Sequence, residues 1–167
     1  ATLTALNSFK RDVHGSLIDE ARDLHGGDII IHAHQPISEQ LQLAVDTLVQ
    51  GKRVNQQKTY EFYTVALSAN EDSSVLSSIK AVESAYPFYG TITLTSGRQL
   101  ADPLRPGEVV VAQEVVDRLD LAMGDRLIIG DVAFIVADIV TFESMRPVSF
   151  LSFGPRIFIS MADLDQL

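Results

Sequence analysis

One stretch of sequence decides the fold class of this chain: Arg126-Leu127-Ile128-Ile129-Gly130-Asp131-Val132-Ala133-Phe134-Ile135-Val136-Ala137-Asp138-Ile139-Val140-Thr141-Phe142. Two apolar runs, Arg126–Ile129 and Ala133–Phe142, flank the pair Gly130-Asp131. A glycine-containing pair between such runs is typical of the tight turn of a β-hairpin. The stretch therefore predicts two short strands joined by a hairpin, within a compact β-rich module.

On both sides of this hairpin the sequence predicts further short strands and loops. The residues of Thr91–Thr95 alternate with period two, as in a half-buried strand. We expect a proline-containing loop at Ala101–Gly107 and an irregular loop at Met145–Gly154. The remaining expected elements of this part are strands Glu108–Ala112 and Arg156–Ser160 and a short helix over Gln113–Leu119.

The N-terminal half shows an alternation of helices and strands. Apolar residues at helical spacing predict an amphipathic helix over Leu3–Leu24, and Ser38 begins a second helix that reaches Val49. We expect strands at Asp28–His34 and Thr59–Leu67 and a third helix over about Ser74–Ser84. The sequence thus predicts a mixed α/β fold of the α+β class, with a subdomain inserted around residues 96–143.

Composition excludes several classes of protein. The chain has 167 residues, 46% of them apolar, no cysteine and a formal net charge of −9. The acidic balance argues against nucleic acid and against unaided docking on anionic lipid, because both need clusters of lysine and arginine. Without cysteine, disulfides, thiolate nucleophiles, zinc knuckles and iron–sulfur sites are all excluded. No apolar run approaches the ~20 residues that cross a bilayer.

Histidine and serine are the first candidates for chemistry. His32 and His34 lie two apart on an expected strand, so they would share a face, and His25 comes shortly before. Three imidazoles can bind a transition metal, but the spacing matches no established zinc pattern, and a solvated strand face is the favoured interpretation. Ser77-Ser78-Ile79-Lys80 contains S-x-x-K, on an expected helix and without the other motifs of that chemistry.

No other motif assigns a reaction. Neither G-x-G-x-x-G nor a Walker A sequence occurs, so no nucleotide site is indicated. The acidic groups Asp19-Glu20-Asp23, Glu71-Asp72 and Asp163-Asp165 lack the spacing of a calcium loop and are interpreted as a solvated surface. The sequence therefore assigns no catalytic, cofactor-binding or metal-binding residue, names no cofactor, and predicts a protein that is not an enzyme.

The C-terminal residues suggest a helix that has only begun. Ser160 is a suitable N-cap, and Asp163 lies three residues later, where the acid of a capping box is found. Only four residues follow Asp163. Either the chain is a fragment cut from a longer protein, or these residues form a short terminal turn; this feature alone leaves both open.

Several short motifs in a fixed order resemble the extracytoplasmic domain of a bacterial ABC-transporter permease. The resemblance is to the MacB/FtsX/LolC superfamily, and within it to the YbbP-like branch, and it spans essentially the whole chain. It is carried by Gly26–Ile31 before Pro36-Ile37, Ile79–Val82 running into Tyr86–Gly90, Pro106–Val111, Leu119–Asp125, Ile128–Gly130 and Phe153–Arg156.

The resemblance implies a MacB-like periplasmic core domain with two lobes. A porter-like α/β lobe would comprise residues 1–95 and 144–167, and an inserted β-rich lobe residues 96–143. The domain would be non-catalytic and would couple cytoplasmic ATP hydrolysis to handling of a lipid, lipoprotein, peptide or protein outside the inner membrane. The implied partners are a separate ABC ATPase and a second permease, and the implied location of this part is the periplasm.

Two other functions stay open at this stage. One is a free-standing extracytoplasmic module that binds or senses a small ligand or peptide, with Tyr86, Phe88 and Tyr89 lining a groove. The other, less favoured, is a hydrolase whose Asp, Ser and His residues come from distant parts of the sequence. Glycines such as Gly90, Gly107, Gly124 and Gly130 are expected to serve turns that need a positive φ.

Overall fold

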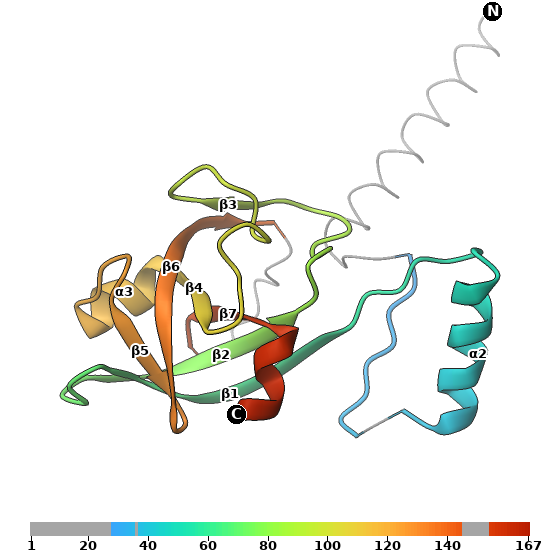
Figure 1. Ribbon diagram of the computed structural model, residues 1–167, viewed down its shortest axis with the longest axis horizontal. Helices are drawn as coiled ribbons and strands as arrows, with labels where there is room; N and C mark the ends of the chain where they lie inside the picture. Colours follow the sequence, from blue (N-terminus) through green and yellow to red (C-terminus); the bar gives the residue numbers. More distant parts are fainter. Residues whose placement is uncertain (1–27, 36, 145–153) are drawn as a thin grey trace, which may run out of the picture.

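The structure is a computed structural model that describes residues 28–35, 37–144 and 154–167. The helix expected over Leu3–Leu24 and nearly all of the loop expected over Met145–Gly154 lie outside the described residues. Figure 1 shows a β-rich body and, beside it, a separate helical arm.

Six strands of the body close into a barrel. Their pairings run in the order β1–β2–β7–β4–β6–β5, and β5 pairs with β1 again, so that the sheet returns to its first strand. The β2–β7 and β4–β6 pairs are parallel and the other four are antiparallel. The barrel strands are β1 (Thr59–Ser68), β2 (Ser74–Val82), β4 (Glu108–Ala112), β5 (Arg126–Ile129), β6 (Val132–Glu143) and β7 (Arg156–Ser160).

The barrel interior is the main hydrophobic core. Alternate residues of each strand point inward, as the pleat requires, and Phe134 is among the largest fully buried side chains. Helix α3 (Gln113–Leu119) adds Val115 and Leu119 to this cluster, and the terminal 3₁₀ helix η1 (Met161–Gln166) packs Met161 and Leu164 against it. The other inward residues are Ala66, Val75, Ile79, Ala81, Val109, Val111, Leu127, Ile129, Val136, Ile139, Ile157 and Ile159.

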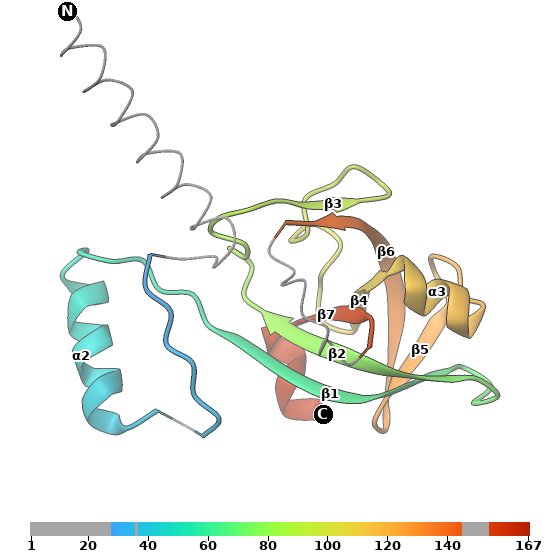
Figure 2. The ribbon, with the colours of Figure 1, turned by 180° about the vertical axis from the view of Figure 1, so that it is seen from behind.

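A second, smaller core lies outside the barrel. The short strand β3 (Ile92–Leu94) pairs with the end of β6, and the loop after it covers outward residues of the neighbouring strands (Figure 2). A β-bulge in β6 makes this possible, since Val109 pairs with Val136 but Val110 pairs with Asp138. Val136 therefore belongs to the inner cluster, whereas Asp138 shares the outer face with Val110.

Most of the elements expected from the sequence are confirmed, and so is the α+β class. Gly130-Asp131 forms the two-residue hairpin between β5 and β6, with Ile129 opposite Val132. Ser38 caps α2 (Glu39–Gln50), and Ser160 caps η1 by accepting from the amide of Ala162. The four glycines named for positive φ all have it, at 60–94°.

Two expected elements are wrong. The segment Ser74–Val82 is strand β2 and not a helix: Val75, Ile79 and Ala81 point into the barrel, in strand rather than helical periodicity. The segment Asp28–His34 is not a strand, because none of its residues forms a ladder with another described strand. Its three isoleucines are exposed instead.

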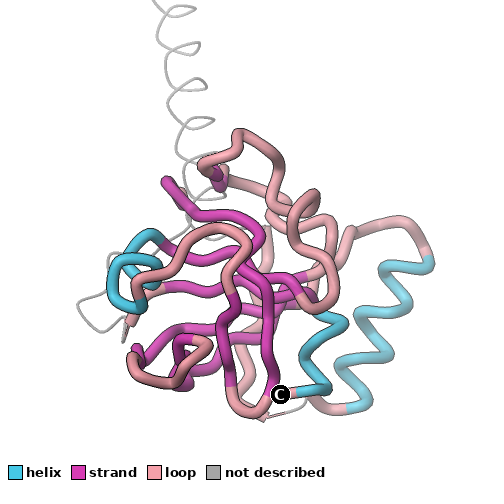
Figure 3. Tube along the Cα trace, turned by 60° about the vertical axis from the view of Figure 1, so that its left-hand side comes forward, coloured by secondary structure: helices cyan, strands magenta, loops and turns pink. Residues whose placement is uncertain are grey.

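The described residues before β1 form an arm that stands beside the barrel (Figures 1 and 2). We define the arm as residues 28–35 and 37–58. Its helix α2 is amphipathic, yet none of its twelve residues is buried. Figure 3 shows the arm as an extended segment, α2 and a second irregular segment that leads into β1. No helix among the described residues is long and apolar enough to cross a membrane.

The division into two lobes stays a prediction. Strands β4, β5 and β6 come from residues 96–143, and β1, β2 and β7 come from residues outside that range. The two groups are joined by the β1–β5 and β4–β7 pairings of one barrel.

Candidate functional site

The histidines do not lie on a common strand face. His32 and His34 are exposed and belong to the irregular part of the arm, and His25 lies outside the described residues. Over residues 28–35, 37–144 and 154–167, no three His, Asp or Glu side chains are grouped as metal ligands. The structure therefore brings no described residue to His32 or His34 that would complete a metal site.

Ser77 and Lys80 of the S-x-x-K sequence point to opposite faces of β2. On a helix they would be neighbours, but residues three apart on a strand lie on different sides. Ser77 is fully buried, and its hydroxyl donates to the carbonyl of Val75 at 3.4 Å. Lys80 lies on the outer face, so it is not placed to act as a base for Ser77.

The interpretation of the acidic groups as a solvated surface is wrong for Asp163, which is buried and has a structural role. Its carboxylate is almost fully buried and both oxygens accept from the backbone amide of Gly107, at 3.1 Å each. Gly107 has a φ of 82°, in the left-handed region that favours glycine. The bond fixes η1 to the turn that precedes β4.

The most notable polar site is a charge cluster on the outer face of the barrel, comprising Glu61, Ser78, Lys80, Glu143 and Arg156. Arg156 Nη1 lies 2.7 Å from Glu61 Oε1 and donates to Ser78 Oγ at 3.0 Å. Ser78 Oγ in turn donates to Glu61 Oε1 at 3.0 Å. Arg156 Nε lies 3.8 Å from Glu143 Oε2. One guanidinium therefore joins β1, β2, β6 and β7.

Lys80 occupies the same face beside this guanidinium. It is paired across the ladder with Glu61 and Phe158, and its ammonium lies 4.9 Å from the centre of the Tyr86 ring. The Tyr86 ring packs against Phe158 at 6.1 Å between centroids. The face of the Tyr86 ring is therefore the contact that attracts the ammonium of Lys80.

Burial and neighbouring charges shift several pKa values in the cluster. Burial, followed by the nearby Arg156, lowers the pKa of Lys80. Burial by itself raises the pKa of Glu61, but the charge and the hydrogen bond of Arg156 outweigh it, so the carboxyl has a lowered pKa. Burial and the charge of Glu143 raise the pKa of Tyr86. The lowered pKa of Glu61 favours its carboxylate form, and the raised pKa of Tyr86 favours its protonated form.

Three polar atoms of this region are buried without a hydrogen-bond partner. They are Tyr86 Oη, Glu143 Oε1 and Arg156 Nε. Leaving such atoms unsatisfied costs about 1–3 kcal/mol each. These unsatisfied atoms lower the stability of the fold at the cluster. The formal charges of its two basic and two acidic side chains nevertheless cancel.

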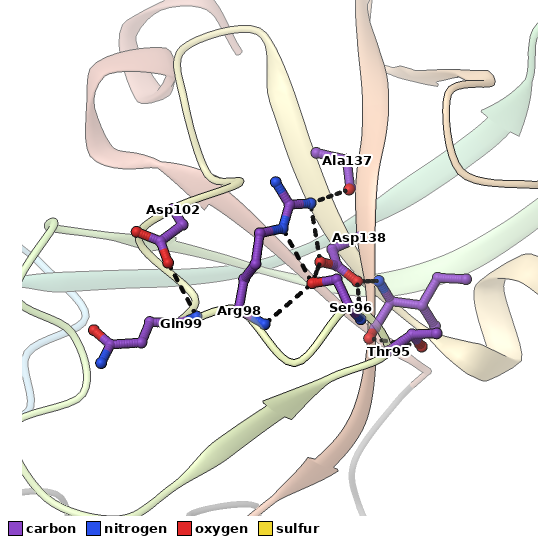
Figure 4. A network of polar contacts seen from close by, with 8 residues as sticks. Thr95, Ser96, Arg98, Gln99, Asp102, Ala137 and Asp138 are labelled. Carbon is purple, nitrogen blue, oxygen red and sulfur yellow. Dashed lines mark hydrogen bonds and ion pairs between the residues drawn. The ribbon is translucent and has the colours of Figure 1, made fainter.

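A second polar network clamps the loop after β3 to strand β6 (Figure 4). Asp138 is fully buried, and its carboxylate accepts from the hydroxyl of Ser96, from Arg98 Nη2 at 3.1 Å and from the amide of Ile139 at 2.9 Å. Arg98 also donates to the carbonyl of Ala137 at 3.1 Å. These hydrogen bonds, Ser96 foremost, outweigh the effect of burial and lower the pKa of Asp138.

The hollow near Tyr86 does not have the size of a ligand site. It measures about 40 Å³ and lies between the end of β2, the 100–104 loop and Ser160. Small-molecule pockets are typically several hundred Å³. The hollow can hold water, and it lends no support to the small-ligand interpretation of Tyr86.

The charge cluster and the Asp138 network each join segments of the barrel that are distant in the sequence. Every serine of the cluster and clamp bonds to a carboxylate that is already paired with an arginine, so neither Ser78 nor Ser96 has a free base beside it. No local sequence pattern assigns a role to Glu61, Arg98, Asp138, Glu143 or Arg156. A charged residue inside an apolar strand, as in Phe134–Val140, is the signal that could have found Asp138.

Comparison with known proteins finds one curated relative and solved structures of similar fold. No family model matches it. The uncharacterised ABC transporter permease YbbP of Escherichia coli strain K12 is 25% identical over 169 residues, which covers 99% of this chain and 20% of the relative. The chain thus spans about one fifth of the length of that curated relative.

Two solved structures share the fold. The periplasmic region of MacB from Actinobacillus actinomycetemcomitans matches with a TM-score of 0.51 and 13% identity, over 74% of this chain and 57% of that one. The extracellular domain of the noncanonic ABC-type transporter YknZ from Gram-positive bacteria matches with a TM-score of 0.56 and 10% identity, over 75% and 64%. The resemblance to the outer domains of MacB-type ABC permeases, predicted from the motifs, is confirmed, and so is the likeness to YbbP.

Proposed function

We propose that this chain is the extracytoplasmic domain of an inner-membrane ABC-transporter permease and that it transmits movement without catalysing a reaction. The observation that carries the proposal is the match of 99% of the chain to one fifth of the permease YbbP. The MacB-type and YknZ-type folds support it, since both come from the outer parts of transporters.

The closed barrel suits a domain that must pass on force. Each barrel strand is paired on both edges over part of its length. Each described barrel strand is therefore held by a neighbour on either side and cannot slide independently of the barrel. Packed interiors resist deformation and move as units. A force applied at one end of the barrel would therefore displace the whole barrel with little deformation.

The charge cluster gives this transmission a specific route. Arg156 opens β7 and Glu143 closes β6, so their pair spans the two ends of the connection between these strands. Glu61 and Ser78 tie the same arginine to β1 and β2. A displacement of the facing ends of β6 and β7 would therefore also displace the β1–β2 hairpin.

The remaining parts of the proposal concern the whole transporter. A separate ABC ATPase would act on the full-length permease, a second permease would complete the assembly, and the cargo would be a lipid, lipoprotein, peptide or protein partner in the periplasm. The proposed lobes, residues 1–95 with 144–167 and residues 96–143, would exchange force through the β1–β5 and β4–β7 pairings.

Cysteine labelling of the full-length permease tests the location. Asp131 lies exposed in the β5–β6 turn, and this chain has no cysteine of its own. In a cysteine-free background, Asp131→Cys should react with a membrane-impermeant maleimide in cells with a permeabilised outer membrane. Ala66→Cys, fully buried in the barrel, is the matched control and should stay unlabelled. Labelling of Asp131→Cys only after the inner membrane is broken would overturn the proposal.

Spin labels at Asp131→Cys test the coupling. In permeases purified with their ATPase, trapping ATP should change the distance between the labels of the two outer domains. A distance that is the same with and without ATP would contradict a role in transmitting movement. An ATPase variant that cannot bind nucleotide provides the control.

A further inference from the structure

Both ends of the arm are bonded to one short segment of the chain. At the start of the arm, Asp28 Oδ2 accepts a hydrogen bond from the Tyr89 hydroxyl at 3.2 Å. At its end, the backbone amide of Lys58 donates to Glu83 Oε2 at 3.0 Å. We define residues 83–90, which follow β2, as the anchor segment. The arm therefore begins and ends at the anchor segment.

The helix of the arm has little to hold it in place between these two ends. None of the twelve residues of α2 is buried. Within the described residues, the hydrogen bonds of α2 and of the turn after it are local, and they join residues three to five apart in the sequence. An element with few buried contacts is easily displaced. A displacement of the arm would therefore act on the rest of the chain at the anchor segment and at the start of β1.

The anchor segment inserts one side chain into the smaller core outside the barrel. The backbone amide of Tyr86 donates to the carbonyl of Glu83 at 3.0 Å, so the two residues share a tight turn. Tyr86 is 8% exposed, and its ring lies 6.1 Å from the ring of Phe158, measured between centroids. The buried Tyr86 hydroxyl has no hydrogen-bond partner. The turn and the packing therefore set the position of the ring.

The same ring is a contact of the charge cluster. The ammonium of Lys80 lies 4.9 Å from the centre of the Tyr86 ring, and attraction of this kind is lost beyond about 6 Å. Burial, followed by the charge of Glu143, raises the pKa of Tyr86, which is a second sign that the ring and the cluster interact. A small displacement of the ring would therefore weaken its contact with Lys80.

We propose that the anchor segment couples the position of the arm to the charge cluster. Glu83 binds the end of the arm, the turn from Glu83 to Tyr86 moves the ring, and the ring displaces or releases Lys80. Coupling between two sites is reciprocal, so a change at Lys80 also alters how firmly the arm is bound. The coupling extends the proposed function by a place at which movement enters the barrel, and it rests on that function only for the source of the movement.

Tyrosine signals report the effect of the arm on the cluster. Lys58→Pro removes the amide that donates to Glu83 and leaves the sequence of the anchor segment unchanged. In NMR spectra of chains with isotope-labelled tyrosine rings, of which there are four, the Tyr86 signal should shift by more than its line width. Gln56→Pro is the matched control, since the amide of Gln56 donates to no described residue, and should leave this signal in place. An unchanged Tyr86 signal in Lys58→Pro, or an equal shift in both variants, would overturn the proposal.

Amide exchange reports the effect of the cluster on the arm and does not depend on the folding of a proline variant. Lys80→Met removes the ammonium from the Tyr86 ring but keeps a long unbranched side chain on β2. The Lys58 amide should then exchange at least about twofold faster, the lower end of what the loss of one hydrogen bond produces. Lys52→Met, at an exposed lysine within the arm, is the matched control and should leave this rate unchanged. The same rate in Lys80→Met as in the unmodified chain contradicts the coupling.

Both experiments use this chain alone. The labelling and spin-label tests above use the full-length permease, so failure of the coupling is distinguishable from failure of the proposed function.

Discussion

The barrel and the arm follow opposite rules although one chain forms both. In the barrel every strand pairs with segments far away in the sequence, and its interior residues are fully buried. The arm is tied to the rest of the chain by hydrogen bonds at its two ends, from Tyr89 to Asp28 and from Lys58 to Glu83, and α2 between them has no buried residue although its sequence is amphipathic. An amphipathic sequence is thus enough to form a helix, but it does not determine where the helix packs. A helix or strand is buried only where another part of the molecule offers a complementary apolar surface. Variants in one region therefore test whether the stability of the other region changes.

The largest effect is expected from Phe134, which fills the barrel interior. Phe134→Ala should lower the free energy of unfolding by about 3–5 kcal/mol, because it removes a fully buried ring and leaves a cavity among six strands. Leu43→Ala in the arm is the matched change, at a side chain that is 65% exposed, and should cost less than about 0.5 kcal/mol. Urea unfolding of both variants at low protein concentration measures the difference. Equal losses would mean that the arm belongs to the same cooperative unit.

A smaller loss is expected from the charge cluster. Arg156→Ala leaves Glu143 buried without its cation and should cost about 2–3 kcal/mol, less than a fully buried pair because Glu61 is partly exposed. Arg118 pairs with Glu114 at 2.6 Å on the surface of α3 and provides the control. Arg118→Ala should change stability by no more than about 0.5 kcal/mol. Thermal unfolding of both variants decides, and similar melting temperatures would show that the cluster is not a structural link.

The clamp at Asp138 should make stability depend on acid pH. Its pKa in the folded chain is lower than in the unfolded chain, so its contribution is complete above about pH 4 and is lost as the pH falls through the folded-state value. Asp138→Asn should cost about 1–3 kcal/mol at pH 7, where hydrogen bonds to the charge are lost. The difference from the unmodified chain should shrink on acidification. Urea midpoints from pH 7 to pH 2.5 test this, and a constant difference would contradict it.

Local sequence patterns predicted those elements whose surroundings agree with them. The hairpin at Gly130-Asp131 follows from turn chemistry, and Glu108–Ala112 and Arg156–Ser160 follow from short apolar runs. The helix predicted over Ser74–Ser84 is wrong because the apolar residues Val75, Ile79 and Val82 fit helical spacing as well as a strand. Pairing with β1 over nine residues on one side and with β7 on the other makes it a strand, and no local pattern contains that information.

Long-range geometry also accounts for what was missed in the candidate site. The barrel closes through β1–β5 and β5–β6, and the sequence does not show which strands will meet. Arg156 gains its role only because β1, β2 and β6 converge on it. The bulge opposite Val109-Val110 turns Asp138 to the outer face, where strict alternation would leave it on the same side as Val136. The motifs that carry the resemblance lie on strands β2 and β4 as well as on turns, and the likeness to outer domains of permeases that they predicted is confirmed.

The smallest effect is expected at Ser38, and it sharpens the contrast between arm and barrel most directly. Its hydroxyl accepts from the amide of Leu41 at 3.4 Å and caps α2. Ser38→Ala should destabilise α2 by about 0.5–1 kcal/mol and raise amide exchange there, because a twelve-residue helix without buried contacts has little else to hold it. The barrel amides should exchange as before, since no barrel strand depends on α2. Faster exchange in β1 as well would show that the arm stabilises the barrel, and slow exchange in α2 would point to a partner that covers it.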